Sequence, residues 1–325
     1  MIAPALPAEL HAALDAKLNG VSRSEVAARA AQISKTYREG GRSTAISSQT
    51  DALAYAAARM PATYAALAAS LNALSELRPE FSPKTLLDVG AGPGTASWAA
   101  AKAFASLTSF VLLDANNALR ALALDLAQRS SRLGQMTYPR GDAATLLTSA
   151  EPADLVVASY VVGELDETER TKLAAQLWAK TSDMLVVVEP GTPAGYARII
   201  ALREQLTGGG ADVVAPCPHN RACPLRSPDW CHFTQRLARS RTHKQVKGAE
   251  LPFEDEKFSY VVLSKNGVAN RPSRVLAQPV VGKVEVAAKL CTVDGLALVK
   301  VPHRDKTAYA AARRWRWGDA VMEET

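Results

Sequence analysis

The sequence lacks several features that would place it in a specialised class of protein. None of its apolar runs approaches the ~20 residues of a membrane-spanning helix. Its first ten residues hold no basic stretch, no apolar core and no Arg- and Ser-rich amphipathic run, so we expect neither a secretory signal nor a transit peptide. Repeats and low-complexity linkers are also missing. At 325 residues, of which 48% are hydrophobic and 22% charged, the composition is typical of a globular protein of about two domains.

Cysteine and excess positive charge are absent from the first two thirds of the chain and gather in the last third. Residues 1–210 carry 19 Lys and Arg against 20 Asp and Glu, whereas residues 211–325 carry 19 against 12. All four cysteines lie in this basic third. Because no secretory route is expected, we predict a cytoplasmic protein whose thiols are reduced or metal-bound rather than disulfide-bonded.

The first 80 residues are predicted to be helical. One helix covers about 7–17, and a second opens at the capping-box pattern of Ser22 and Glu25. A third helical segment, 51–77, is expected to break at Pro61, because proline lacks the amide donor that a helix interior needs.

Short apolar runs then alternate with helical patterns. The runs that predict buried strands are 85–89, 110–114, 154–158 and 184–189, with a weaker one at 136–138. This alternation predicts an α/β fold with a doubly wound parallel sheet. The rhythm stops in a segment rich in Pro, Cys, His and Arg and returns with strands at 258–263, 284–291 and 296–301.

We therefore expect four parts in the chain. They are a helical N-terminal module (1–80), a Rossmann-like domain (81–207 plus 257–270), a cysteine-rich basic insertion (208–256) and a small C-terminal β unit with a basic tail (271–325).

A glycine loop follows the first predicted strand and opens a helix. It reads Asp88-Val-Gly90-Ala-Gly92-Pro-Gly94, and its glycines allow a tight turn and a close approach to a ligand. The spacing differs from the G-x-G-x-x-G of dinucleotide folds, and Pro93 removes one amide donor. The loop instead resembles the first motif of class I S-adenosylmethionine (SAM) methyltransferases. The resemblance implies a SAM site made of Asp88, Gly90, Gly92, Gly94, Asp114 and Asp142.

Two of these residues have specific expected roles. Asp114 closes the next strand, where an acidic side chain can accept both ribose hydroxyls, and Asp142 closes the third strand, where the family often places a carboxylate near the adenine amino group. An alternative is a plain strand–turn–helix with incidental acids.

The positions expected to be catalytic are less informative. The fourth strand is not followed by the Asn/Asp-Pro-Pro-Tyr/Phe motif of methyltransferases that act on base amino groups, and no cysteine lies nearby to support a covalent C5-pyrimidine mechanism. The polar candidates are Tyr160, Glu164 and Glu189, and we expect Glu164 or Tyr160 near a methyl acceptor. Alternatively, Glu164 caps a helix or pairs with a basic group.

The cysteine spacing indicates a metal site. Cys217, Cys223 and Cys231 are separated by five and seven residues, and Cys291 follows sixty residues later. Four thiolates can hold a tetrahedral zinc ion or a [4Fe–4S] cluster. Zinc knuckles usually use tighter pairs, so the wide spacing favours the cluster. A mixed ligand set that includes His219 or His232 stays open, as does a set of four unconnected thiols.

The surroundings of the cysteines are basic. Between 217 and 247 the only acidic residue is Asp229, and the tail from 304 to 317 interleaves basic residues with Tyr309, Trp315 and Trp317. Such clusters neutralise phosphates, and flat aromatic rings can stack on unpaired bases. We therefore expect RNA binding, against the plainer alternative of a solvated charged face.

The chain resembles the methyltransferase-like proteins of the mitochondrial small ribosomal subunit (the Rsm twenty-two type) and their bacterial relatives. The resemblance rests on 54–64, the glycine loop, Val188-Glu-Pro-Gly-Thr-Pro193, the four cysteines and Trp315-Arg-Trp-Gly-Asp319. It implies a [4Fe–4S] cluster on Cys217, Cys223, Cys231 and Cys291, and binding to small-subunit rRNA during ribosome assembly.

Three functions are compatible with these observations. The first is a SAM-dependent methyltransferase acting on small-subunit rRNA, and the second is an assembly or quality-control factor that binds rRNA without methyl transfer. A small-molecule methyltransferase leaves the basic third unexplained. We expect a bacterial member of the family, with no membrane partner and monomeric away from the ribosome.

Overall fold

The computed structural model describes residues 1–268 and 271–321. Its N-terminal part consists of α1 (Ala8–Leu18), α2 (Arg23–Arg38), a 3₁₀ turn (Ser43–Ala45) and α3 (Gln49–Leu77). The predicted break at Pro61 is wrong, because α3 runs unbroken through it. Proline in a helix interior costs about 3 kcal/mol, but most residues of α3 are buried, so packing outweighs that loss.

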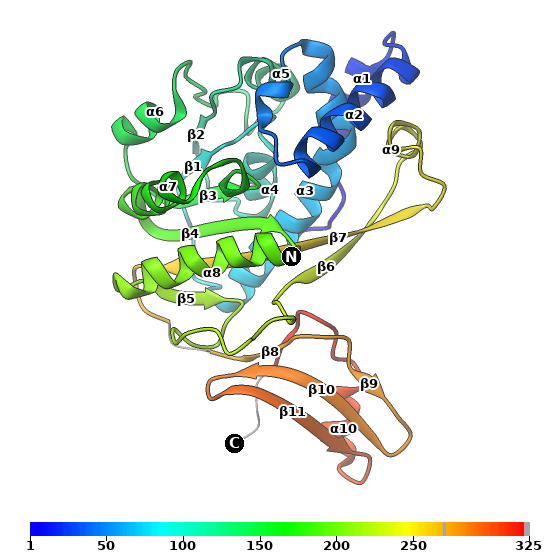
Figure 1. Cartoon of the computed structure of the whole chain (residues 1–325), viewed down its shortest axis with the longest axis vertical. Coiled ribbons are helices and arrows are strands. Elements are labelled where there is room, and N and C mark those ends of the chain that lie inside the picture. Colours follow the sequence, from blue (N-terminus) through cyan, green and yellow to red (C-terminus); the bar gives the residue numbers. More distant parts are fainter. Residues whose placement is uncertain (269–270, 322–325) are drawn as a thin grey trace.

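The main sheet follows the predicted alternation of strands and helices (Figure 1). The strands are β1 (Thr85–Val89), β2 (Ser109–Leu113), β3 (Ala153–Ser159), β4 (Thr181–Pro190), β5 (Asp212–Ala215), β6 (Phe233–Ala238) and β7 (Phe253–Ser264). The intervening helices are α4 (Thr95–Ala103), α5 (Asn117–Ala127), α6 (Ala143–Ser149), α7 (Glu167–Lys180), α8 (Pro193–Gly208) and α9 (Arg241–Lys247).

The strand order confirms the predicted fold. It is β2-β1-β3-β4-β7-β5, with β6 paired to the first half of β7. Neighbours from β2 to β4 are parallel, and β7 is antiparallel to β4, β5 and β6. The weak strand expected at 136–138 is reduced to one parallel bridge between Val111 and Thr137. The result is a methyltransferase-like α/β sheet of the Rossmann type.

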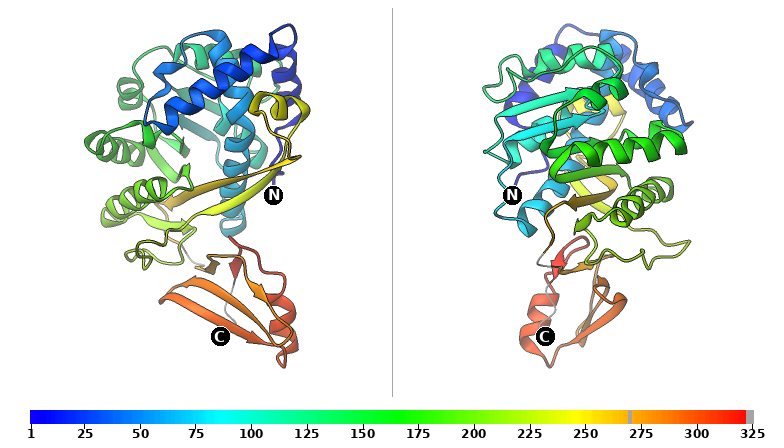
Figure 2. Two further views of the ribbon diagram at one scale, coloured as in Figure 1. Left: turned by 45° about the vertical axis from the view of Figure 1, so that its right-hand side comes forward. Right: turned by 90° about the vertical axis from the view of Figure 1, so that its left-hand side faces the viewer.

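Alternation along the strands builds a layer on each face of this sheet. Leu86 of β1 faces α3, α4 and α5, whereas Leu87 faces α7 and α8. Figures 1 and 2 show these helices covering the two faces, with α1 and α2 packed outside α3. The carboxyl ends of the parallel strands therefore meet at one edge, which is where ligands bind in open α/β sheets.

The segment 208–256 contributes strands to the main sheet. β5 and β6 both pair with β7, and the loop between them, 216–232, carries three of the cysteines. The division of the chain into four units stays a prediction.

The C-terminal part forms a second, smaller sheet. Its strands are β8 (Ser273–Val275), β9 (Val280–Val281), β10 (Glu285–Thr292), β11 (Gly295–Pro302) and β12 (Ala320–Val321). The order is β11-β10-β8-β12, and α10 (Lys306–Ala312) packs against β10 and β11. Figure 2 shows this part below the main sheet. Among the described helices, none is both long and apolar enough to cross a membrane.

Candidate functional site

The glycine loop adopts a conformation that requires glycine. Gly90, Gly92 and Gly94 have φ values of 69°, 52° and 82°. The loop is bound to the last residue of β2, because the Gly90 and Ala91 amides donate to the Leu113 carbonyl at 2.8 and 3.1 Å. A Cβ on Gly90 would lie 2.5 Å from a methyl of Val161, so a larger residue there meets both strain and a clash.

Asp114 lies directly beside this loop. One carboxylate oxygen accepts the Gly92 amide at 2.8 Å, and the other accepts the Asn116 amide at 2.7 Å. Each oxygen keeps a second lone pair. Desolvation raises the pKa of Asp114. A carboxylate at this position can accept two further hydroxyl donors, as the sequence predicts for a ribose.

Asp88 is buried beneath the loop. Its Oδ2 accepts the Ser97 amide and hydroxyl at 3.0 and 2.8 Å, and its Oδ1 has no hydrogen-bond partner among the described residues. Burial raises the pKa of Asp88 to about 7. Asp88 therefore braces the loop from the inside, and its contact with a cofactor stays a prediction.

Asp142 has a local role. Its carboxylate accepts the amide and hydroxyl of Thr145, which caps α6, and these bonds lower its pKa. The strand that Asp142 was expected to close is reduced to the bridge at Thr137, so that part of the prediction is wrong and its role at the adenine stays a prediction.

A large cavity lies over the ends of β3 and β4. Its volume is about 950 Å³, and its walls come from α2, α3, α8 and the loop after β3. Tyr160, Glu164 and Glu189 all line it, so the structure brings together the three polar candidates from the sequence.

The Glu164 carboxylate is hydrogen-bonded to the N-terminal part. It accepts hydrogen bonds from the Tyr37 hydroxyl at 3.1 Å and from the amide and hydroxyl of Ser43 at 2.9 and 2.8 Å. Asn116 binds the same segment from the other side, donating to the Ser43 and Ile46 carbonyls. Segment 37–46 thus bridges the loops after β2 and β3, and Glu164 is one of its anchors.

Tyr160 is held in an unusual conformation. It is the one described non-glycine residue with positive φ, at 58°. Its hydroxyl donates to Glu256 Oε1 at 2.9 Å, and Arg59 binds the same oxygen at 3.2 Å. Desolvation raises the pKa of Tyr160 well above its ordinary value. This strained residue is oriented by an internal ion pair.

Glu189 is fully buried at the end of β4. Arg198 Nε donates to its Oε2 at 2.7 Å, while Oε1 has no hydrogen-bond partner among the described residues. Burial raises the pKa of Glu189.

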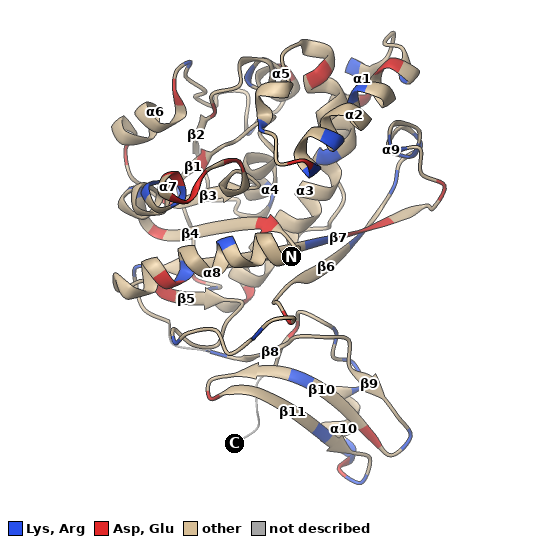
Figure 3. Ribbon diagram, viewed as in Figure 1, with Lys and Arg blue, Asp and Glu red and all other residues tan. Residues whose placement is uncertain are grey.

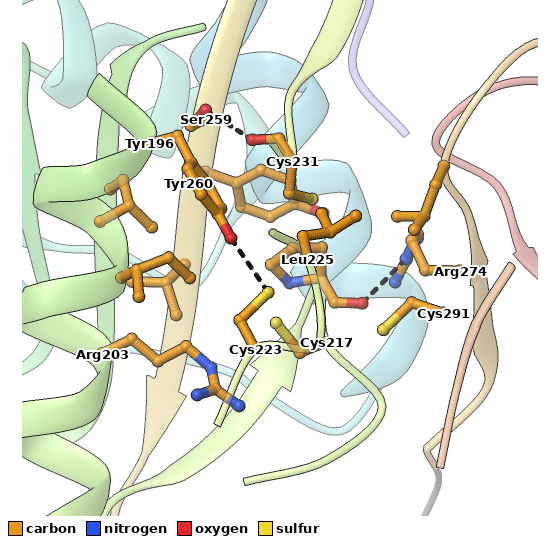
Figure 4. Close-up of a pocket in the computed structure, with 15 residues that line it drawn as sticks. Tyr196, Arg203, Cys217, Cys223, Leu225, Cys231, Ser259, Tyr260, Arg274 and Cys291 are labelled. Carbon is orange, nitrogen blue, oxygen red and sulfur yellow. Dashed lines mark hydrogen bonds between the residues drawn. The ribbon is translucent and has the colours of Figure 1, made fainter. Parts of the chain in front are cut away.

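The four cysteines line one cavity (Figure 4). Cys217, Cys223 and Cys231 lie in the loop between β5 and β6, and Cys291 comes from β10. None forms a disulfide. No described group of three or more His, Cys, Asp or Glu side chains is arranged to hold a single metal ion. The free volume is about 20 Å³, so a bound cluster would require the side chains that line the cavity to rearrange.

The walls of this cavity hold the cysteines from several elements. Tyr196 of α8 donates to Cys223 Sγ at 3.1 Å, and Ser259 of β7 donates to the Cys231 carbonyl at 2.8 Å. Desolvation raises the pKa of Cys291 to about 12.

The two nearby histidines differ in position. His219 Nε2 lies 3.7 Å from Cys291 Sγ. His232 instead stacks on Trp230 and meets Trp317 edge-on, and it does not line the cavity. Desolvation lowers the pKa of both histidines.

The basic residues form a less uniform surface than the sequence suggests. Arg236 pairs with Asp255, and Arg239 and Lys247 both bind Glu254. In the tail, Tyr309 and Trp315 pack into the C-terminal core. Figure 3 shows Lys and Arg positions spread along the ribbon of the C-terminal part, with acidic positions among them. Within residues 211–325, the exposed basic residues without an ion pair to any described residue are Arg221, Arg226, Arg241, Lys257, Lys265, Lys283, Arg304, Lys306, Arg313, Arg314 and Arg316.

Sequence reasoning missed two groups at these sites. Tyr37 and Ser43 are brought to Glu164 by the fold of the N-terminal part, and the sequence carried no signal for this contact. Arg203 and Arg274, buried beside the cysteines, are an unusual choice for an interior. The apolar pattern around each could have indicated their burial.

With this geometry in place, comparison with known families is decisive. The family model "Mitochondrial small ribosomal subunit Rsm22" matches residues 49–322. The chain belongs to the Rsm22 family. The match covers the glycine loop and all four cysteines, and it confirms the resemblance at the level of the family.

Two curated relatives of the Rsm22 chain illustrate the similarity. Human "Ribosome assembly protein METTL17, mitochondrial" is 30% identical over 288 residues, which cover 83% of this chain and 62% of the relative. "Rsm22-cox11 tandem protein 2, mitochondrial" of Schizosaccharomyces pombe is 27% identical over 335 residues, which cover 85% and 44%. The chain thus spans less than two thirds of either relative.

A solved structure with a similar arrangement is the magnesium protoporphyrin IX methyltransferase (ChlM) of Synechocystis PCC 6803 with bound SAH. It is 12% identical, with a TM-score of 0.42, over 63% of this chain and 84% of that chain.

The relatives correct one prediction. A bacterial cytoplasmic location was expected, but the human relative and both fission-yeast relatives are named as mitochondrial proteins. The cytoplasmic prediction is therefore wrong.

Proposed function

We propose that this chain is a methyltransferase-like assembly factor of the mitochondrial small ribosomal subunit. It binds SAM at the glycine loop, holds a [4Fe–4S] cluster on four cysteines and binds rRNA through its basic residues. The name of its family and that of its human relative support the ribosomal role. The observation that carries the proposal is the convergence of Cys217, Cys223, Cys231 and Cys291 on one cavity from two distant segments.

The SAM part of the proposal rests on the loop and its acidic neighbours. Gly90 and Gly92 have positive φ, so their backbone can approach a ligand closely. Asp114 lies 2.8 Å from the loop and has spare acceptor capacity for ribose hydroxyls.

The metal part rests on the donor set. Four thiols without a disulfide around one cavity fit a thiolate-bound centre. Zinc is the alternative, and the spacings of five and seven residues favour the larger cluster. A bound cluster supplies a fixed link between the β5–β6 loop and β10, which joins the C-terminal sheet to the main sheet.

RNA binding rests on the exposed basic residues. Six of the unpaired ones, Lys283, Arg304, Lys306, Arg313, Arg314 and Arg316, lie in the C-terminal part, and Arg221, Arg226 and Arg241 lie in the segment around the cysteines or at α9. Phosphate contacts of this kind give strong, salt-dependent affinity. Because the tail aromatics pack inward, we expect backbone recognition rather than stacking on bases.

We favour assembly over methyl transfer because the candidate catalytic side chains are occupied. Glu164 accepts three hydrogen bonds from the N-terminal part, and the Tyr160 hydroxyl donates to Glu256. An rRNA methyltransferase is the second candidate, supported by the glycine loop and by the cavity of about 950 Å³ over the ends of β3 and β4.

The test is binding and methyl transfer on one preparation. Purified chain is mixed with small ribosomal subunits and with their precursors, in the presence of methyl-labelled SAM. We expect salt-dependent binding to precursors without label in the rRNA. Label in the rRNA supports the enzyme instead, and a chain that binds neither particle contradicts both functions.

A further inference from the structure

Two buried arginines flank the cysteine cavity from opposite sides (Figure 4). Arg203 of α8 is 1% exposed and is among the largest fully buried side chains, and Arg274 of β8 is 3% exposed. Neither forms an ion pair with any carboxylate in the part of the chain that the structure describes. A buried charge without a partner is strongly unfavourable.

Their hydrogen bonds aim them at the cysteine segments. Arg203 Nη2 donates to the His219 and Arg221 carbonyls, both at 2.7 Å, within the loop that joins Cys217 to Cys223. Its Nε and Nη1 are buried without a hydrogen-bond partner among the described residues. The guanidinium is thus fixed beside the thiols with unused donors.

Arg274 approaches from the C-terminal sheet. Its Nε donates to the Pro216 carbonyl at 3.1 Å, directly before Cys217, and its Nη1 donates to the Gly318 carbonyl at 2.8 Å. In the β8–β10 register it lies opposite Cys291. One arginine therefore comes from each side of the site.

We propose that Arg203 and Arg274 are the counter-charges of the cysteine site, and that they stabilise an anionic thiolate–metal centre there. A [4Fe–4S]²⁺ core or a Zn²⁺ ion with four thiolates carries two negative charges, which two guanidinium groups balance. This inference rests on the proposed metal site. It assigns the arginines a positioning and electrostatic role, without making them ligands.

The two arginine charges act differently in the metal-bound and in the metal-free protein. In the metal-free state no carboxylate among the described residues compensates the two buried guanidinium charges. A bound thiolate–metal centre would place negative charge beside these guanidinium groups, and the attraction between them would stabilise the bound state. Reduction of a cluster adds one more negative charge, so the arginines also favour the reduced state.

The experiment compares full-length variants Arg203→Met, Arg203→Lys and Arg274→Met with Arg226→Met. Arg226 is an exposed arginine of the same cysteine loop, and its charge is already solvated. Each protein is prepared metal-free, then reconstituted anaerobically with iron and sulfide or loaded with zinc. The first readout is the gain in melting temperature on loading, and the second is the reduction potential of the cluster in a dithionite titration.

We expect the gain in melting temperature to shrink in Arg203→Met and Arg274→Met, to be largely kept in Arg203→Lys and to be unchanged in Arg226→Met. At a fixed potential the reduced-to-oxidised ratio should fall about tenfold in each Met variant, which is about 59 mV for one electron. If the arginines have only a structural role, each Met substitution should lower the melting temperatures of the metal-free and the loaded protein equally and leave the reduction potential unchanged. That result would overturn the inference. If the wild-type chain binds neither iron–sulfur nor zinc, the proposed metal site itself fails.

Discussion

The glycine loop and the cysteine cavity differ in the sign of the buried charged group that keeps free hydrogen-bonding atoms beside them. Beneath the glycine loop, Asp88 has one buried carboxylate oxygen without a hydrogen-bond partner among the described residues. Beside the cysteines it is Arg203 that has unused donors. Interiors tolerate such groups where a ligand of the opposite charge completes them. The difference predicts a cationic ligand such as the SAM sulfonium at one site and an anionic metal centre at the other.

The two sites also differ in how they are built. The glycine loop is one contiguous turn between β1 and α4, whereas the cysteine cavity needs α8, the β5–β6 loop and β10 to meet. Substitutions that change the local backbone should therefore disrupt the glycine loop, whereas the cysteine cavity should be disrupted by the loss of any one of its three segments.

The largest effect is expected for Cys291→Ser, which removes the cysteine of the C-terminal sheet. Since binding of a structural metal contributes on the order of 10 kcal/mol, we expect loss of bound metal and a drop of several kcal/mol in the stability of the loaded protein. The measurement is metal content with thermal unfolding. Ser at exposed Val293 is the control, and retention of full metal content in Cys291→Ser would count against the site.

At the glycine loop, Gly90→Ala should be the most destabilising small substitution. It combines positive φ with a Cβ contact of 2.5 Å to Val161, for an expected loss of roughly 2–5 kcal/mol in unfolding free energy. Gly20→Ala is the matched control, since Gly20 also has positive φ but open space around it. Equal losses in the two variants would show that the Val161 contact is unimportant.

Asp88 makes stability depend on pH. Its pKa is about 7 when folded and near 3.8 when exposed, so the folded state binds the proton more tightly. The favourable contribution is full below about pH 4 and is lost as pH rises towards 7, over a range of roughly 2–4 kcal/mol. Asp88→Asn should flatten this part of the pH–stability curve measured by denaturant unfolding. An unchanged slope would contradict the burial of an unpaired carboxyl there.

Asp114→Asn should weaken SAM binding by roughly tenfold or more, because an amide NH₂ replaces one acceptor oxygen beside the Gly92 and Asn116 amides. The measurement is isothermal titration calorimetry with SAM. Asp142→Asn is measured in the same way, because Asp142 is the other carboxylate expected to contact the nucleoside part of SAM. A larger loss in Asp142→Asn than in Asp114→Asn would reverse the assignment of the ribose contact.

Glu164→Gln should have the smallest effect. One carboxylate oxygen remains an acceptor, so we expect a loss of about 1 kcal/mol and looser packing of segment 37–46, seen by hydrogen exchange. If subunits are methylated at all, their methylation should be unaffected. A selective loss of methyl transfer would restore Glu164 as a catalytic residue.

Local patterns allowed most of the main sheet and the glycine loop to be predicted. The glycine loop directly follows β1 and Asp114 directly follows β2, and these two strands pair in parallel, so the predicted strands already place the loop and Asp114 together. The unbroken helix at Pro61 could not be predicted, because burial of its surroundings outweighs the local cost of proline.

The cysteine site was predicted only in part. The spacing of Cys217, Cys223 and Cys231 suggested a shared site, but not the walls around it. Arg203 and Arg274 come from α8 and β8, which meet only through the tertiary fold. The inward packing of Tyr309 and Trp315 was missed for the same reason, because their helix and turn cover the second sheet.

Metal analysis of anaerobically purified wild-type chain distinguishes a [4Fe–4S] cluster on the four cysteines from zinc and from free thiols. We predict about four iron and four sulfide per chain, with an electron paramagnetic resonance signal after reduction by dithionite. Zinc near one per chain, or protein free of iron and sulfide after anaerobic reconstitution, would contradict the claim.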